Sequence, residues 1–207
     1  MSMFMTKFYR YLGFVYIPQY LKELDEDIIL HISDTTTNFF QDVKKLVTVL
    51  KPKYIVHTGD LVDNIKLQFL SASEGRYALR VKTLLEIMEG SSAEKIFISM
   101  GNHDSINAVK GLCTKCVITE DMDTIEIEGI KIAISHYPKR IMEYEGDAKH
   151  FMFGHSLELK TQMIDDKVYL NGISSINIMT IKSRQIYKLP YPYVVDDWRM
   201  KKGKLGL

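Results

Sequence analysis

Three things are scarce in this sequence: cysteine, long hydrophobic runs and net charge. The longest apolar stretch near the N-terminus, LGFVYI, is too short to span a bilayer, and no small-residue cleavage site follows it. The formal net charge of +1 gives no support to dedicated nucleic-acid binding. From these absences we expect neither a membrane partner nor a nucleic-acid partner, and we take the cytoplasm as the default location.

The two cysteines, Cys113 and Cys116, form the motif Cys-Thr-Lys-Cys. Structural zinc usually needs four ligands from paired motifs, and the chain has no second pair. A redox pair would normally open a helix, whereas this pair leads into VIT, which is typical of a strand. We therefore predict two reduced thiols near a strand start, with no part in the mechanism.

A chain of 207 residues that is 46% hydrophobic and 26% charged suits one globular domain with a sizeable core. Apolar runs predict buried strands over residues 27–33, 53–58 and 94–99. Helical periodicity predicts helices over residues 38–50 and about 76–89. Ser71 and Glu74 have the spacing of a capping box, which would start the second helix earlier. This alternation of strands and helices implies parallel pairing.

After residue 115 the segments become short, rich in β-branched residues and separated by turn signals. They are VIT, TIEIE, IKIAIS, HFMFG, KVYLN, INIMTI and RQIYKL. Parallel β/α units followed by mostly β segments predict an α/β fold, a two-sheet α/β/β/α sandwich with helices outside. We assign residues 27–190 to this domain, residues 1–26 to an aromatic strap packing on the core, and residues 191–207 to a C-terminal tail.

Polar residues follow five of the apolar runs, at the points where strands are expected to end. They are Asp34, the block GDLVD at 59–63, the block GNHD at 101–104, His136, and the pair Gly154-His155. Open α/β sheets bind their ligands at strand ends. Carboxylates, an amide oxygen and imidazoles that converge there favour a metal centre over a dinucleotide or acyl-transfer site.

In this order the blocks resemble the motifs of the calcineurin-like metallophosphoesterases, over residues 28 to about 175. The resemblance implies two metal positions and phosphate-ester hydrolysis. The metal ligands that it implies are Asp34, Asp60, Asn102, His136 and His155. It also implies that His103 faces the leaving oxygen and that Asp104 orients His103. For Asp63 we predict support of a neighbouring ligand or of the loop.

The match departs from the family pattern at two positions, both in the first metal site. Thr36 and Leu157 stand where the family has metal-binding histidines. The first site then keeps only Asp34 and the shared Asp60, which suits a hard ion held weakly. We expect one tight metal site and one weak or vacant site. Mn²⁺ is the ion we expect, with Fe, Zn or Mg as alternatives.

Two classes of function follow. In the first, the chain is a metal-dependent hydrolase of phosphomonoesters or phosphodiesters, including nucleotide-type substrates, because little chain is left for a cap over the site. In the second, it is a degenerate scaffold of the same fold that binds a protein partner through its aromatic N-terminal segment or its tail. The pair His103-Asp104 favours the hydrolase, since a scaffold has no need of it. Whether the chain forms a homo-oligomer is left open.

Overall fold

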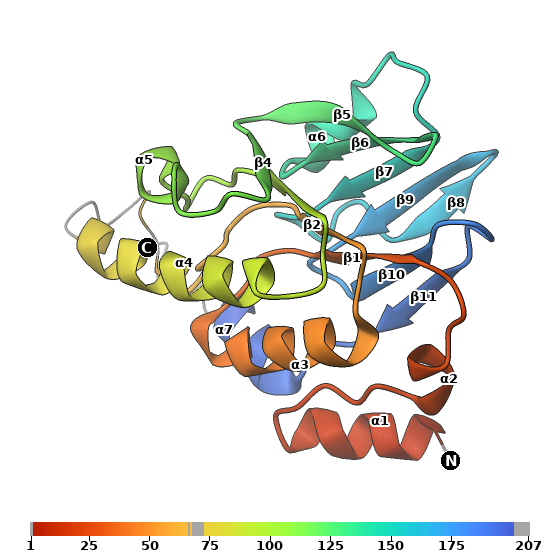
Figure 1. Cartoon of the computed structure of the whole chain (residues 1–207), viewed down its shortest axis with the longest axis horizontal. Helices are drawn as coiled ribbons and strands as arrows, with labels where there is room; N and C mark the ends of the chain where they lie inside the picture. The colour runs from red at the N-terminus through yellow and green to blue at the C-terminus, as the bar shows by residue number, and fades with distance from the viewer. Residues whose placement is uncertain (1, 66, 68–72, 201–207) are drawn as a thin grey trace.

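The computed structural model describes residues 2–65, 67 and 73–200, and Figure 1 shows the arrangement of the elements. One sheet has the strand order β11-β10-β1-β2-β3-β4. Its strands are β1 (Ile28–Ile32), β2 (Tyr54–His57), β3 (Lys95–Ser99), β4 (Cys116–Thr119), β10 (Ile176–Thr180) and β11 (Ile186–Leu189). Strands β1 to β4 pair in parallel, as predicted, and β10 and β11 extend the sheet by antiparallel pairing.

The second sheet has the order β5-β6-β7-β9-β8. Its strands are β5 (Met122–Ile127), β6 (Ile130–Ser135), β7 (His150–Phe153), β8 (Gln162–Ile164) and β9 (Lys167–Asn171). The central strands β6, β7 and β9 are parallel, and the two edge strands are antiparallel. Strand β8 was not predicted, since its three residues are all exposed and show no alternation.

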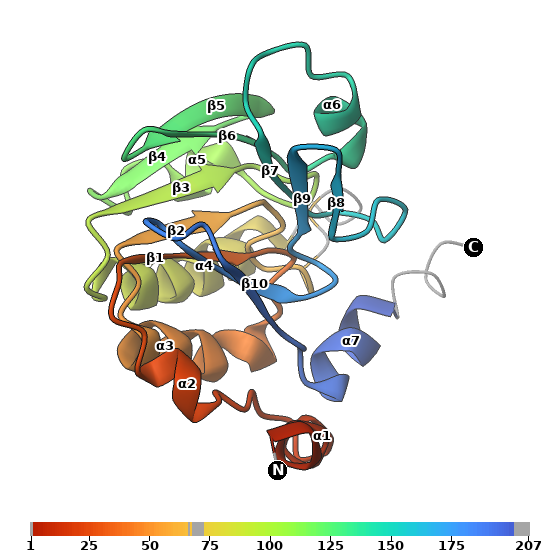
Figure 2. The same ribbon diagram turned by 90° about the vertical axis from the view of Figure 1, so that its right-hand side faces the viewer.

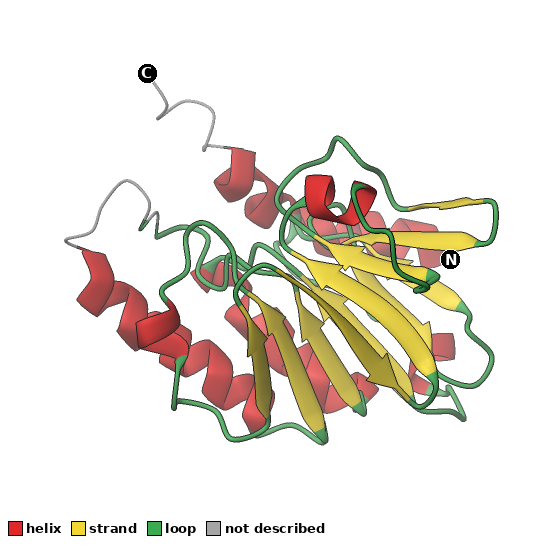
Figure 3. Cartoon of the chain, turned by 90° about the horizontal axis from the view of Figure 1, so that it is seen from above, coloured by secondary structure: helices red, strands yellow, loops and turns green. Residues whose placement is uncertain are grey.

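Helices cover the outer faces of the two sheets (Figures 1 and 3). Helix α3 (Phe40–Leu50), which follows a 3-10 turn at Thr37–Phe39, and helix α4 (Glu74–Glu89) pack on the first sheet. The short helix α6 (Pro138–Met142) packs on the second sheet through Ile141. The layers therefore run helix, sheet, sheet, helix, which confirms the predicted α/β/β/α sandwich.

Strand β1 shows how the apolar runs build these layers. All five of its residues are buried. Ile28, Leu30 and Ile32 belong to the core shared with α3 and α4, whereas Ile29 belongs to the core between the two sheets. Successive side chains of a strand point to opposite faces, so a strand covered on both sides is mostly apolar, and in β1 the one polar residue is the buried His31.

The first and the last described segments of the chain lie side by side below the first sheet (Figure 2). The N-terminal segment carries α1 (Ser2–Tyr11) and α2 (Gln19–Lys22), and the C-terminal segment carries α7 (Tyr193–Met200). Val15 is anchored to α3, since Asp42 accepts a hydrogen bond from its N–H at 2.9 Å and Lys45 donates to its carbonyl at 2.7 Å. Among the described residues, no helix is long and apolar enough to cross a membrane.

The state of the two cysteines differs from our expectation. The prediction of reduced thiols is wrong, because Cys113 and Cys116 form a disulfide in the turn before β4. The turn brings their Cα atoms to 5.4 Å, within the span that a disulfide bridges, and the spacing alone does not set the redox state.

The capping box predicted for the second helix includes Ser71, which lies outside the described residues. Helix α4 begins at Glu74, and its N-cap residue Ser73 makes no side-chain capping bond. A short helix, α5 (Ile106–Val109), follows the GNHD block.

Candidate metal centre

The predicted site residues follow strands whose carboxyl ends meet at one edge of the two sheets. Asp34, Asp60 and Asn102 follow β1, β2 and β3 of the first sheet. His136 and His155 follow β6 and β7 of the second. Tertiary packing thus gathers side chains from five strands and from both sheets.

His136 is at the centre of the cluster. Its Nε2 atom lies 3.1 Å from Nδ1 of His155, 3.2 Å from Oδ1 of Asn102 and 3.6 Å from Oδ1 of Asp60. Donor atoms bound to one transition-metal ion at about 2.0–2.2 Å are separated by distances of this size. Nε2 of His136 thus has a second imidazole, an amide oxygen and a carboxylate oxygen close to it, and donors of these types suit one divalent ion.

The tautomer of His136 is set by the backbone behind it. Its Nδ1–H donates to the carbonyl oxygen of Thr58 at 2.7 Å, so the lone pair on Nε2 faces the cluster. Burial alone would lower the pKa of His136. The carboxylates of Asp60 and Asp34, together with that carbonyl, outweigh burial, and the pKa is raised. The site therefore stabilises positive charge at this position.

Two motif glycines allow neighbouring motifs to approach this closely. A Cβ atom on Gly59 would lie 2.6 Å from Nδ1 of His136, and its φ of +85° favours glycine in any case. A Cβ atom on Gly154 would lie 2.7 Å from Oδ2 of Asp34. The glycines of the GD and GH blocks are needed because ligands from other strands occupy the space beside them.

Three of the candidate ligands have left-handed backbone conformations. The φ angles are +49° at Asp34, +53° at Asp60 and +66° at His155. Non-glycine residues adopt this region at a cost, and they do so mainly where surrounding contacts hold them there. Such strain at three ligands of one cluster is typical of a functional site.

The first metal position has fewer donors. Asp34, Asp60 and His136 each place one ligand atom within 4.8 Å of the others. Oδ2 of Asp34 accepts hydrogen bonds from Ser33 Oγ at 2.7 Å and from the N–H of His155 at 3.1 Å. At the two positions where the family has metal-binding histidines, this chain offers no imidazole. The hydroxyl of Thr36 donates to the side chain of Asn38, and Leu157 is 59% exposed.

His103 lies beside the metal cluster and is buried. One of its ring nitrogens and one carboxylate oxygen from each of Asp60 and Asp63 lie within 4.8 Å of one another. The backbone N–H of His103 donates to Oδ1 of Asp60 at 3.0 Å, which ties the GNHD block to the GD block. Asp63 is therefore a carboxylate close to His103.

Asp104 joins the loops that follow β2 and β3. Its carboxylate accepts four hydrogen bonds, each of 2.8 Å, from the N–H groups of Asp60, Leu61 and Gly101 and from the hydroxyl of Tyr77. Burial, followed by the nearby Asp104 charge, raises the pKa of Tyr77, which keeps its hydroxyl a donor. These contacts brace the loops; that Asp104 also orients His103 stays a prediction.

Three residues that support the site were not singled out from the sequence. Thr58 acts through its carbonyl, and Tyr77 is a buried residue of α4 that belongs to none of the predicted motifs. Arg199 lies in the segment assigned to the tail, yet its guanidinium reaches the carbonyl oxygens of Ser33 and Asp34. A backbone carbonyl and an arginine far away in the sequence belong to no sequence motif, so motif analysis could not identify them.

Two other buried histidines stand apart from the donor set. His31 accepts from Asn177 Nδ2 at 3.1 Å and donates to Thr58 Oγ1 at 3.0 Å, so both of its ring nitrogens are engaged. Nε2 of His57 lies 2.8 Å from Thr35 Oγ1. Burial lowers the pKa of each to about 3, so both are neutral.

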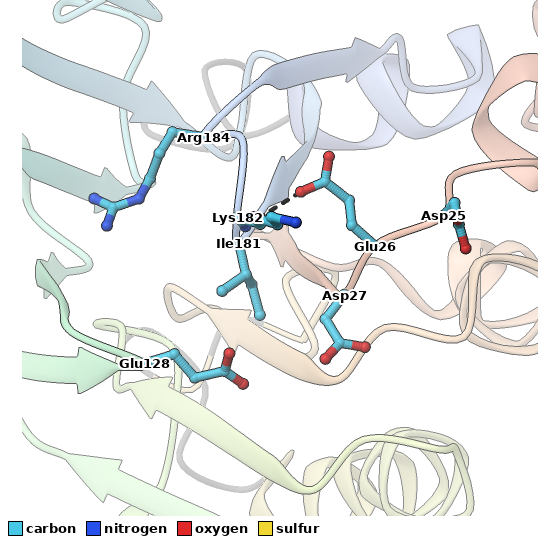
Figure 4. A pocket seen from close by; sticks show the side chains of 7 residues that line it. All are labelled: Asp25, Glu26, Asp27, Glu128, Ile181, Lys182 and Arg184. Atoms are coloured by element: carbon cyan, nitrogen blue, oxygen red, sulfur yellow. Dashed lines mark hydrogen bonds between the residues drawn. The ribbon is translucent and has the colours of Figure 1, made fainter.

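A pocket of about 490 Å³ lies at the opposite end of β1 (Figure 4). Its lining contains several carboxylates, and these are held by neighbouring groups. Glu26 accepts three hydrogen bonds from Lys182 and Ser183, and Lys53 pairs with both Asp27 and Glu128. These contacts account for the carboxylates of Glu26, Asp27 and Glu128 without a ligand.

Comparison with known proteins agrees with this site. A model of the calcineurin-like phosphoesterase family matches residues 28–198, and the chain belongs to that family. Membership implies dependence on a divalent metal and supports a phosphoesterase function. The match also extends beyond residue 175, where the motif resemblance was expected to end, and includes most of α7. No curated protein sequence matches the chain significantly.

Several solved structures are similar in fold, and two of them are phosphoesterases by their own names. One is a novel archaeal phosphodiesterase, with a TM-score of 0.54 and 18% identity, covering 78% of this chain and 98% of that one. The other is YfcE, a phosphoesterase from E. coli, with a TM-score of 0.51 and 14% identity, covering 80% of this chain and 99% of that one. At these identities the similarity establishes the shared fold.

Proposed function

We propose that this protein is a metal-dependent phosphoesterase that hydrolyses phosphomonoesters or phosphodiesters by direct attack of water, without a covalent enzyme intermediate. The observation that carries the proposal is the convergence on Nε2 of His136 of donor atoms from His155, Asn102 and Asp60. Polar turn residues that meet by chance would not surround a histidine whose tautomer is also fixed by a backbone carbonyl, as that of His136 is.

The tight metal site consists of Asp60, Asn102, His136 and His155. These four residues would hold a divalent ion, which would supply polarisation of a phosphoryl oxygen and a lowered pKa of a nearby water. Mixed imidazole, amide and carboxylate donors suit Mn²⁺, which is the ion we propose, and Fe, Zn or Mg would use the same atoms. Asp34 and the shared Asp60 are the two carboxylates proposed for the weak first position.

His103 is the proposed proton donor to the leaving oxygen. It is buried next to two carboxylates, Asp60 and Asp63. A protonated imidazole at this position can stabilise charge on the phosphoryl group and protonate the departing alkoxide. Asp104 contributes by holding the loops that carry Asp60 and His103 in register.

Substrates with an accessible phosphate ester, such as nucleotide-type compounds and phosphodiesters, fit this proposal. The archaeal structural neighbour is described as a phosphodiesterase, which points in the same direction. We also propose that the protein acts on substrates in the cytoplasm.

The test is turnover of p-nitrophenyl phosphate and bis-p-nitrophenyl phosphate with added Mn²⁺, together with metal content per chain. Wild type is compared with His155→Ala, which removes a ligand, and with His150→Ala, a histidine on β7 outside the cluster. We expect Mn²⁺-dependent turnover that His155→Ala abolishes and His150→Ala preserves.

A second variant separates chemistry from metal binding. His103→Ala should abolish turnover while metal content stays at the wild-type value, because His103 is not among the proposed ligands. Loss of metal in this variant would show that it is a ligand. No turnover of either ester with any divalent ion by folded wild-type protein would overturn the hydrolase and favour the scaffold that binds a protein partner.

A further inference from the structure

The rings of His136, Tyr137 and His155 contact one another. The ring centroids lie 5.0 Å apart for His136 and Tyr137, 5.1 Å apart for Tyr137 and His155, and 4.9 Å apart for the two histidines. The three interplanar angles are between 62° and 80°, so each pair meets edge to face, an arrangement that aromatic rings prefer. Two of these rings belong to proposed ligands of the tight metal site. The third ring, that of Tyr137, therefore contacts both imidazoles of this site.

The backbone of Tyr137 is fixed on both sides. Tyr137 directly follows His136, and its N–H donates to Ser135 Oγ at 3.2 Å. It is also the N-cap residue of α6, whose first residue is the buried Pro138. A residue before proline is held in an extended conformation, and the φ of −95° and ψ of 122° of Tyr137 agree with this. The partly buried ring of Tyr137 is therefore attached to a rigid stretch of chain.

The two imidazole ligands differ in how the chain holds them. His136 is completely buried, and its Nδ1–H donates to the carbonyl oxygen of Thr58. His155 is exposed and lies in the loop after β7, with a φ of +66°. Its backbone N–H donates to Asp34, and this bond fixes the main chain but does not select the rotamer of the side chain. The ring of Tyr137 lies against the imidazole of His155 and so limits its rotation.

We propose that Tyr137 is a positioning residue of the tight metal site. Its ring packs against that of His155 and keeps Nδ1 of this histidine 3.1 Å from Nε2 of His136, where both nitrogens can bind one ion. A ligand that is already in place loses less conformational entropy when the ion binds. This inference rests on the metal site of the proposed function, and it does not depend on which ester is hydrolysed.

The experiment measures Mn²⁺ binding to the full chain by electron paramagnetic resonance of the free ion. Tyr137→Leu removes the aromatic ring, whereas Tyr137→Phe keeps the ring and removes only the hydroxyl. Tyr144→Leu is the matched control, because the ring of Tyr144 packs on that of Phe151, with centroids 5.6 Å apart, outside the metal cluster. Circular dichroism checks that each variant is folded. Nitrogen-15 NMR of the His155 ring reports its order before metal is added.

We expect Tyr137→Leu to weaken Mn²⁺ binding by about tenfold or more, the usual effect of losing a group that orients a metal ligand. Tyr137→Phe and Tyr144→Leu should bind Mn²⁺ as the wild type does, because both keep the ring at position 137. In metal-free Tyr137→Leu, the signals of the His155 ring should show averaging over several rotamers, which the wild type and Tyr137→Phe should not show.

Wild-type Mn²⁺ affinity in folded Tyr137→Leu would overturn the proposal. An equal loss in Tyr137→Phe would also overturn it, by assigning the effect to the hydroxyl, as would an equal loss in Tyr144→Leu. Mn²⁺ binding that depends on the ring, in protein that hydrolyses neither ester, would support this inference and overturn only the proposed function. Wild-type protein that binds no divalent ion would overturn both.

Discussion

The Nε atom of Arg199 donates a hydrogen bond of 2.8 Å to the carbonyl oxygen of Asp34. The same buried guanidinium donates to the carbonyls of Ser33 at 2.6 Å and Ile173 at 3.1 Å, and it lies 3.8 Å from the centre of the Tyr191 ring. The last helix of the domain thus holds the loop that carries a candidate metal ligand. Because Asp34 is in a left-handed conformation, an external clamp of this kind is a physical reason for its persistence.

Removing the clamp should weaken metal binding. We predict that Arg199→Ala lowers Mn²⁺ affinity and turnover by about 10- to 100-fold, the usual effect of losing a partner that orients a metal ligand. Arg199→Lys should restore little, because one ammonium cannot reach three carbonyls in a fixed fork. Electron paramagnetic resonance titration of free Mn²⁺ measures the affinity.

Added guanidinium ion should partly restore Mn²⁺ binding to Arg199→Ala, since the missing group is a planar donor. Arg184→Ala, which removes an exposed arginine, serves as the control and should bind Mn²⁺ normally. Mn²⁺ affinity equal to wild type in folded Arg199→Ala would show that the Asp34 loop holds itself.

The close approach of Gly59 to His136 gives a second prediction. In Gly59→Ala the new Cβ would lie 2.6 Å from Nδ1, so the ring must shift away from the cluster. Metal content should fall well below that of the wild type. Gly129→Ala is the matched control, because Gly129 also has positive φ but has open space around it. If both variants retain their metal, strain at Gly59 is accommodated without moving His136.

Asp104 and Tyr77 allow the bracing role to be measured as stability. Tyr77→Phe removes one donor to a carboxylate and should cost about 1.5–3 kcal/mol. Asp104→Asn should cost more, because one amide oxygen cannot accept the four bonds that the carboxylate accepts. Urea denaturation of both variants tests this order, and the reverse order would contradict the bracing role.

His31 makes stability depend on pH. Its pKa is lowered to about 3, first by burial and then by the nearby His57, whereas the unfolded chain takes up this proton near pH 6.5. Between these values the unfolded state binds more protons, so stability must fall as the pH falls, by up to about 1.4 kcal/mol per pH unit.

His31→Gln, which keeps hydrogen-bonding capacity but does not titrate, should make this dependence shallower by the share of His31, while the equally shifted His57 keeps its own share. The measurement is the free energy of unfolding at about pH 7 and about pH 5 for both proteins. An equal decline in the variant would assign the acid sensitivity to other groups.

The two departures from the family pattern can be reversed. Thr36→His with Leu157→His returns imidazoles to the first metal position, and we predict that metal content rises toward two per chain. Each single variant supplies only one imidazole and should give a smaller increase. Unchanged metal content in the folded double variant would mean that the site is closed for another reason.

Some of the site could be predicted because its signals are local. Asp60, Asn102 and His136 each stand directly after an apolar run, and β2, β3 and β6 end where those runs end. The disulfide could not be predicted, since a Cys-x-x-Cys spacing is compatible with several states of the pair. Asp104 shows a subtler limit: its motif was evident, whereas its partners Leu61 and Tyr77 depend on how β2, β3 and α4 pack.

By itself the sequence determined the alternation of strands and helices from β1 to β3, the two-sheet sandwich and the set of candidate ligands, because hydrophobic periodicity and short motifs act between near neighbours in the chain. Only the tertiary structure decided that His136 faces three donors from other strands, that the apolar side of α1 faces solvent, and that Arg199 clamps Asp34 from 165 positions away. These contacts join segments far apart in the chain, and no local pattern records which distant surfaces will meet.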